Sequence, residues 1–134
     1  MASALDYANE HARRFVDELK DLLRIPSVST QPEHAQDVER AAQWIVDNLK
    51  KIGMERAEVA QAPGFLPLVY AEWMGAGPNV PTALVYSHYD VQPAAMEDGW
   101  RSDPFDPVEC DVVIYGRGTI DSKMRVVVHG KAAE

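Results

Sequence analysis

Hydrophobic residues recur every three or four positions in two stretches of the first 53 residues. They stand at Leu5, Ala8, Ala12, Phe15, Val16, Leu19, Leu22 and Leu23, and again at Val38, Ala41, Ala42, Ile45, Leu49 and Ile52. This spacing predicts two helices that each bury one apolar stripe. The first helix should end near Ile25, because Pro26 disfavours helical geometry in the residue before it. Gly53 is a suitable residue to end the second.

Beyond Gly53 the pattern changes to short β-forming stretches between glycines and prolines. Residues 57–60, 68–73, 82–86 and 112–115 are predicted to be strands. Residues 83–86 are uniformly apolar, as in a strand that helices cover on both faces. A long surface loop is predicted over residues 92–107, and a third helix after Gly118. We therefore expect an α/β fold in which helices and a sheet form layers.

The composition of the chain argues against several classes of binding partner. A chain of 134 residues with 46% hydrophobic and 25% charged residues is typical of one globular domain. The formal net charge of −8 argues against binding to nucleic acid or anionic lipid. We find no apolar run near the roughly 20 residues of a membrane span and no signal segment, so we expect no membrane association and a cytoplasmic location. The single cysteine, Cys110, cannot form an internal disulfide or a thiolate cluster.

The first candidate site follows the predicted strand 82–86. Its sequence is Ser87-His88-Tyr89-Asp90. Side chains two apart in extended chain point the same way, so His88 and Asp90 should project together. Ligand sites form where strands of helix-covered sheets end, and an imidazole held by a carboxylate is an oriented metal ligand. Taken alone, this short pattern also fits a structural hydrogen-bonded pair.

The second candidate site lies in residues 115–123. Gly116 and Gly118 permit a tight turn, and Asp121 stands near the start of the predicted third helix. Asp121 could instead be a simple helix cap, with the glycines serving only the turn. Phosphate binding is not expected, because the glycine and lysine spacing of phosphate-binding loops is absent.

Together these motifs resemble the M20 family of metallopeptidases, especially its dipeptidase and carnosinase-like branch. The ordered motifs are Leu22-Leu23-Arg24-Ile25-Pro26-Ser27-Val28-Ser29, Ser87-His88-Tyr89-Asp90-Val91-Gln92-Pro93, Gly99-Trp100-Arg101-Ser102-Asp103-Pro104-Phe105 and Tyr115-Gly116-Arg117-Gly118-Thr119-Ile120-Asp121-Ser122-Lys123. They span nearly the whole chain. The resemblance implies the zinc-exopeptidase type of catalytic domain, a helix-sheet-helix arrangement.

The resemblance also implies roles for three residues. His88 would ligate one Zn²⁺ ion, and Asp90 would be the catalytic-site residue that orients His88. Asp121 would bridge two Zn²⁺ ions, with Mn²⁺ or Co²⁺ as alternatives. Two such ions polarise an amide carbonyl and activate a water molecule. The implied reaction is hydrolysis of a small dipeptide or an N-acyl amino acid, by an enzyme that is often a homodimer.

Several family features are altered or lie outside these 134 residues. The family usually has glycine where Ser87 and Val112 stand, and aspartate where Ser122 stands, after a bridging aspartate followed by a cis peptide. Its general-base glutamate pair, further metal ligands and lid or dimerisation domain are not in this sequence. We expect residues 1–134 to be the N-terminal portion of the catalytic domain, with an incomplete sheet and no turnover alone. The alternative is a non-catalytic interaction domain or a decayed remnant.

Overall fold

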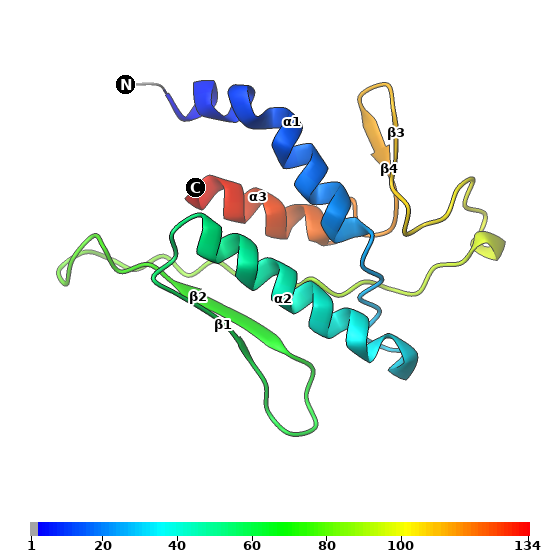
Figure 1. Cartoon of the computed structure of the whole chain (residues 1–134), viewed down its shortest axis with the longest axis horizontal. Helices are drawn as coiled ribbons and strands as arrows, with labels where there is room; N and C mark the ends of the chain where they lie inside the picture. Colours follow the sequence, from blue (N-terminus) through cyan, green and yellow to red (C-terminus); the bar gives the residue numbers. More distant parts are fainter. Residues whose placement is uncertain (1–2) are drawn as a thin grey trace.

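The computed structural model describes residues 3–134 as three main helices and two β-hairpins. In chain order the elements are α1 (Ala4–Leu23), η1 (Pro32–His34), α2 (Ala35–Lys51), β1 (Arg56–Ala60), β2 (Leu68–Glu72), η2 (Met96–Asp98), β3 (Val108–Cys110), β4 (Val113–Tyr115) and α3 (Lys123–Ala133). Helix α1 packs against α3, and α2 packs against the β1–β2 hairpin (Figure 1). The α/β class is confirmed.

The two predicted N-terminal helices are confirmed, and α1 begins with a side-chain cap. The Ser3 hydroxyl accepts a hydrogen bond from the Asp6 backbone N–H at 3.1 Å, and the Asp6 carboxylate accepts one from the Ser3 N–H at 2.9 Å. This reciprocal pair satisfies backbone donors that a helix start leaves without partners. Helix α3 begins at Lys123, later than expected, because residues 118–122 form a turn.

The hydrophobic core lies where the three helices meet. Its buried centre consists of Leu22, Ala41, Ile45 and Val127, and the partly buried residues around it are Leu19, Ile25, Trp44, Leu49, Val69, Tyr89 and Val126. Leu19, Leu22, Ala41, Ile45 and Leu49 belong to the periodic positions that predicted the first two helices. Burial of each large aliphatic side chain stabilises the fold by about 1.5–3 kcal/mol.

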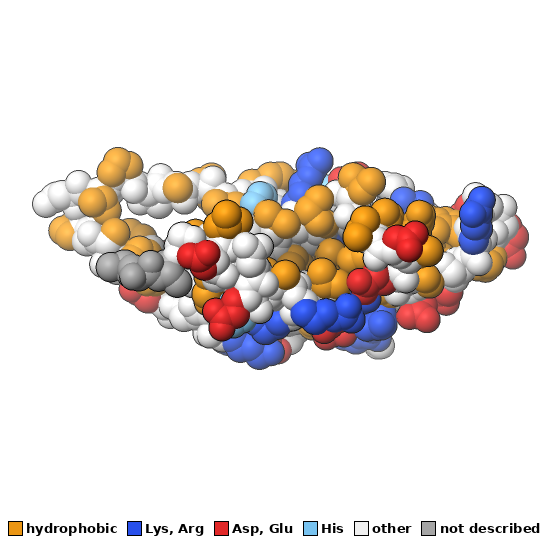
Figure 2. All heavy atoms as spheres, turned by 90° about the horizontal axis from the view of Figure 1, so that it is seen from above, with side chains coloured by type: hydrophobic (Ala, Val, Ile, Leu, Met, Phe, Trp, Pro, Cys, Tyr) orange, Lys and Arg blue, Asp and Glu red, His pale blue; other side chains and the backbone are white. Residues whose placement is uncertain are grey.

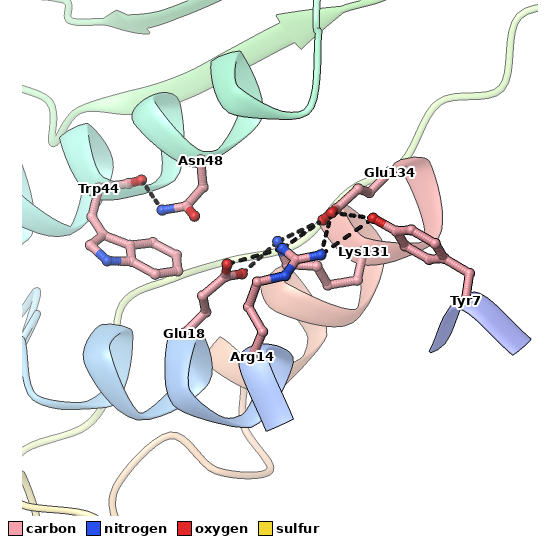
Figure 3. A network of polar contacts seen from close by, with 7 residues as sticks. All are labelled: Tyr7, Arg14, Glu18, Trp44, Asn48, Lys131 and Glu134. Atoms are coloured by element: carbon pink, nitrogen blue, oxygen red, sulfur yellow. Dashed lines mark hydrogen bonds and ion pairs between the residues drawn. The ribbon is translucent and has the colours of Figure 1, made fainter. Parts of the chain in front are cut away.

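A polar network joins α1 to α3 beside this core (Figure 3). The Glu134 carboxylate pairs with Arg14 and with Lys131, and it accepts a hydrogen bond from the Tyr7 hydroxyl at 2.5 Å. Lys131 also pairs with Glu18 at 2.5 Å. Partial burial raises the pKa of Glu134, but its hydrogen bonds to Arg14, Tyr7 and Lys131 outweigh this effect and lower the pKa to about 2. The network therefore holds an ionised carboxylate between the two helices.

The strands form two separate antiparallel hairpins. Strand β1 pairs with β2 from Arg56↔Glu72 to Ala60↔Leu68, and the β3 and β4 strands pair from Val108↔Tyr115 to Cys110↔Val113. In the β3–β4 turn Asp111 adopts a left-handed conformation with φ of 56°, which aspartate tolerates better than most residues. Val112, where the family usually has glycine, therefore needs no positive φ, since Asp111 supplies it.

The predicted strand over residues 82–86 is also wrong. This stretch is extended, but no ladder partner lies beside it within residues 3–134. Leu84 is 93% exposed, and Val85 and Tyr86 are exposed as well. A strand exists only when a neighbour accepts and donates its backbone hydrogen bonds, so the apolar run alone does not make one. The sheet is accordingly incomplete, as expected.

The surface carries many apolar side chains. Orange side chains are exposed over much of the face in Figure 2, including the loop that projects at the left. The large apolar residues exposed between β2 and the candidate site are Trp73, Met74, Val80, Leu84, Val85 and Tyr86. No helix over residues 3–134 is long and apolar enough to cross a membrane.

Candidate metal centre

Two segments far apart in the sequence meet beneath the candidate site. Val28 forms a parallel bridge with Val91, and the Val91 N–H donates to the Ser27 carbonyl at 3.0 Å. The Ser27 hydroxyl donates to the Tyr89 carbonyl at 2.7 Å. Ser27, Val28 and Val91 are all buried. After Pro26 stops helix α1, the chain thus runs beside residues 89–91 and fixes their backbone.

His88 and Asp90 lie together on this fixed backbone. The His88 Nδ1 atom is 3.0 Å from Asp90 Oδ1, so an Nδ1–H would donate to the carboxylate. The expectation that alternate side chains of the extended segment project together is confirmed. In this tautomer the Nε2 lone pair is available to a metal ion.

Asp121 reaches the same place from the turn before α3. Its Oδ1 atom lies 3.2 Å from His88 Nε2, and its side chain is 73% exposed. The Asp121–Ser122 peptide bond is cis, although serine stands where the family usually has aspartate. Ser122 occupies the cap position of α3, so the interpretation of Asp121 as the helix cap is wrong.

The turn that carries Asp121 is packed tightly on the helical core. Gly118 has φ of 90°, and a Cβ atom there would lie 3.1 Å from Val91 Cγ1 and 3.4 Å from Leu23 Cδ2. The fully buried Lys123 amine donates to the carbonyls of Leu22 and Ile25 at the end of α1. Burial lowers the pKa of Lys123 to about 7, against the opposing attraction of Asp37. The turn is therefore anchored to the segment that also holds residues 89–91.

The electrostatics of His88 follow from its two carboxylate neighbours. Partial burial lowers its pKa, but hydrogen bonding to Asp90 and Asp121 outweighs that effect, and the pKa lies above its ordinary value. A cation is therefore favoured at this point. Because a metal ligand must be a neutral imidazole, a bound ion would take the place of that proton.

The donor atoms fit part of a zinc site. Two ligands that each lie about 2.0–2.1 Å from a tetrahedral Zn²⁺ are about 3.4 Å apart, close to the separation of His88 Nε2 and Asp121 Oδ1. A structural or catalytic zinc needs three or four protein ligands. Across residues 3–134, no group of three or more His, Cys, Asp or Glu side chains is arranged to hold an ion. The structure thus brings together an imidazole nitrogen and a carboxylate that could hold a metal ion, with a second carboxylate at the other ring nitrogen.

Two contributors to this arrangement were missed by sequence reasoning. Ser29 donates from its hydroxyl to Asp90 Oδ2 at 2.5 Å, and Lys123 anchors the Asp121 turn. The alternation of Ser27 and Ser29 around Val28 is a signal for two serines on one side of an extended segment. No comparable signal marks Lys123, because lysine is ordinarily exposed.

The other histidines near carboxylate or hydroxyl groups lie in different contacts. His34 Nδ1 is 2.7 Å from Asp37 Oδ2 within the η1–α2 region, and His129 Nδ1 is 2.7 Å from the Ser87 hydroxyl. The Ser87–His129 contact joins the extended segment to α3. Neither pair shares a second carboxylate with the imidazole as His88 does.

Comparisons with known proteins find related sequences. Residues 84–134, which include His88, Asp90 and Asp121, match the family model described as Peptidase family M20/M25/M40. The chain is 35% identical over 135 residues to the "Cys-Gly metallodipeptidase DUG1" of Candida albicans, a match that covers 91% of the chain. It is 34% identical to the human "Beta-Ala-His dipeptidase", over 92% of the chain.

The chain spans only about a quarter of the length of these relatives. It covers 28% of the Candida albicans protein and 26% of the human one. Their whole-protein activities are therefore not transferred by the match alone.

Solved structures show the same fold. The crystal structure of human carnosine dipeptidase 1 superposes with a TM-score of 0.84 at 34% identity, covering 97% of this chain and 29% of that one. The structure of the dipeptidase Dug1p from Saccharomyces cerevisiae gives a TM-score of 0.80 at 28% identity, covering 97% of this chain and 31% of that one. On these matches in sequence and structure, the chain belongs to peptidase family M20/M25/M40.

Proposed function

We propose that this chain supplies the first ligands of a two-metal centre that hydrolyses the amide bond of small dipeptides or N-acyl amino acids. The observation that carries the proposal is the placement of His88. Its Nδ1 atom faces Asp90 at 3.0 Å, and its Nε2 atom faces Asp121 at 3.2 Å. The relatives named for Cys-Gly and β-Ala-His dipeptides support the class of substrate.

Each residue has a distinct task in this proposal. His88 offers the Nε2 lone pair to the first ion, and Asp90 holds the imidazole in the tautomer that frees this atom. Asp121 would supply carboxylate oxygens to the ions, and its exposure leaves the second oxygen accessible. Two bound divalent ions would polarise the substrate carbonyl and acidify a water molecule.

The proposal assigns residues 1–134 to the N-terminal portion of a catalytic domain. The remaining ligands, a general base and a lid or dimerisation domain would come from elsewhere. In the described residues no third metal-facing carboxylate or imidazole stands with His88 and Asp121. We therefore expect no dipeptidase turnover from residues 1–134 alone, because the general base that the family resemblance implies is not among the motifs of this sequence.

The cofactor we propose is Zn²⁺, with Mn²⁺ or Co²⁺ as alternatives. One imidazole and one carboxylate suit all three ions, and the name of the Candida albicans relative contains "metallodipeptidase". The proposed setting is the cytoplasm, and the proposed assembly is a homodimer that binds neither nucleic acid nor membranes. The net charge of −8 supports the absence of a nucleic-acid surface.

A zinc titration of three forms of the chain tests the metal-binding part. Calorimetry should detect weak binding to the parent chain, no binding to His88→Ala, and unchanged binding to His34→Ala. His34→Ala is a matched control, because His34 also contacts a carboxylate but lies in the η1–α2 region. Equal stoichiometry for the parent and His88→Ala would exclude His88 as a ligand.

A second candidate function is a non-catalytic interaction domain. The exposed apolar residues Leu84, Val85 and Tyr86 favour it, because contiguous apolar surface marks contact sites. Sedimentation velocity over a range of concentrations tests this reading. Self-association that is lost in Leu84→Ser would support it, and a monomer at all concentrations would count against it.

A further inference from the structure

The Asp90 carboxylate has a different partner on each oxygen. Its Oδ1 atom faces His88 Nδ1 at 3.0 Å, and its Oδ2 atom accepts from the Ser29 hydroxyl at 2.5 Å. These are the two side chains that hydrogen-bond to this carboxylate within residues 3–134. A hydrogen-bonded series thus runs from Ser29 through Asp90 and His88 to Asp121.

Ser29 is itself held by the core. It follows Val28, which is buried and bridged to Val91, and Ser27, which is buried and bonded to the Tyr89 carbonyl. Residues 27–29 therefore hold residues 89–91 in place through backbone and side-chain contacts. The hydroxyl of Ser29 adds a hydrogen bond to the side chain of Asp90.

The same segment is tied to Asp121. Lys123, two residues after Asp121, donates to the carbonyls of Leu22 and Ile25. Ser29 lies four residues after Ile25. Both ends of the hydrogen-bonded series, Ser29 and Asp121, are therefore linked to the chain at the end of α1. Movement of Ser29 relative to Asp121 is therefore restricted.

We propose that Ser29 is a positioning residue for the metal centre. By holding Oδ2, its hydroxyl fixes the rotation of the Asp90 carboxylate so that Oδ1 accepts from His88 Nδ1–H. That contact selects the Nδ1–H tautomer, whose Nε2 lone pair would be available to a metal ion held between His88 and Asp121. The inference deepens the proposed function, on which it rests, and it adds a group that does not itself touch the metal.

The size of the effect follows from the exposure of the site. Removal of groups that orient metal ligands typically costs 10–100-fold in metal affinity. The Asp90 side chain is 38% exposed, so water can replace part of the lost hydrogen bond. We expect the low end of that range, about 10-fold, for Ser29→Ala.

Four variants separate positioning from stability. Ser29→Ala removes the donor, Ser29→Cys keeps the shape but offers a weak S–H donor, and Ser29→Thr restores a hydroxyl. Thr30→Ala is the matched control at the exposed neighbouring residue. Each variant is compared with the parent chain in its thermal unfolding midpoint, so that any loss of folding is seen directly.

The main readout is the ¹⁵N spectrum of the His88 imidazole in the metal-free chain, recorded at a pH at which the spectrum itself shows the ring to be neutral. The parent, Ser29→Thr and Thr30→Ala should show the Nδ1–H tautomer in excess. Ser29→Ala and Ser29→Cys should lose that excess while their unfolding midpoints stay near that of the parent. An unchanged tautomer ratio in both variants would overturn the proposal.

Zinc affinity provides the second readout. Calorimetry should give about a 10-fold weaker Kd for Ser29→Ala and less than about a 3-fold change for Ser29→Thr. Equal affinity of Ser29→Ala and the parent would contradict the positioning role. If the parent chain binds no zinc, the proposed metal centre fails, and the tautomer spectrum still decides the role of Ser29.

Discussion

The two halves of residues 82–91 are extended alike but are held very differently. Residues 82–86 are mostly apolar and are exposed, and they have no ladder partner in the described chain. Residues 87–91 are mostly polar, yet the segment 27–29 grips them through a backbone bridge and two serine hydroxyls. Hydrophobic character therefore does not indicate which half is fixed.

The difference shows how this chain orders its site. Apolar residues are ordered only where other apolar residues cover them, and no segment among residues 3–134 covers Leu84. Directional hydrogen bonds, by contrast, specify both position and rotation. His88 and Asp90 are fixed because residues 27–29, which follow α1, supply hydrogen-bond partners to their segment.

Truncation of a leucine to alanine should give the largest difference in the free energy of unfolding between a buried and an exposed segment. Leu22→Ala removes a fully buried side chain at the end of α1 and should lower the free energy of unfolding by about 3–4 kcal/mol. Leu84→Ala, in the exposed half, should change it by less than about 0.5 kcal/mol. Urea denaturation measures both. A large loss from Leu84→Ala would show that residues 82–86 are covered in solution.

Glycine substitution tests the packing beneath the held half. Gly118→Ala meets a positive φ and close contacts with Val91 and Leu23, and should cost about 2–3 kcal/mol. Gly64→Ala also has a positive φ, of 80°, but open space around it, and should cost about 1 kcal/mol. Equal losses in the two urea titrations would mean that Gly118 is not packed against Val91.

Removal of the Ser27 hydroxyl tests one contact that holds residues 87–91 in place. Ser27→Ala leaves the Tyr89 carbonyl without its donor at a buried position and should cost about 1–2 kcal/mol. Thr82→Ala removes an exposed hydroxyl from the other half and should be close to neutral. If thermal unfolding ranks the two variants in the opposite order, the Ser27 contact does not hold residues 89–91.

The smallest contrast concerns two tyrosines. Tyr89 donates from its hydroxyl to the Pro67 carbonyl, whereas Tyr86 is exposed. Tyr89→Phe should cost about 1 kcal/mol at neutral pH, and Tyr86→Phe almost nothing. Both can be measured by chemical denaturation. Comparable losses would remove this distinction between the halves.

Measurements at alkaline pH test the direction of the pKa shift of Tyr89. Burial, with a smaller effect from the Asp90 charge, raises the pKa of Tyr89 to about 12 from its ordinary value of 10.0. Its contribution is thus fully present below about pH 10 and is lost as the pH rises to about 12. The stability difference between the parent and Tyr89→Phe should shrink over that interval. A difference that grows there would contradict the assignment.

The sequence predicts the helices well because their apolar periodicity is a local property. It also predicts that His88 and Asp90 project together, since that follows from extended geometry alone. It fails for residues 82–86, where burial depends on a neighbour rather than on composition. It fails for Ser29 and Lys123 as well, because their partners are 61 and 98–101 residues away along the chain.

The most direct test of the central claim is paramagnetic NMR with Mn²⁺ added to the parent chain. We expect the amide signals of residues 27–29, 87–91 and 120–123 to broaden first, because these three segments lie around His88 Nε2 and Asp121. Signals of the β1–β2 hairpin should persist. Broadening centred on His34 and Asp37, with residues 87–91 unaffected, would contradict a metal centre at His88.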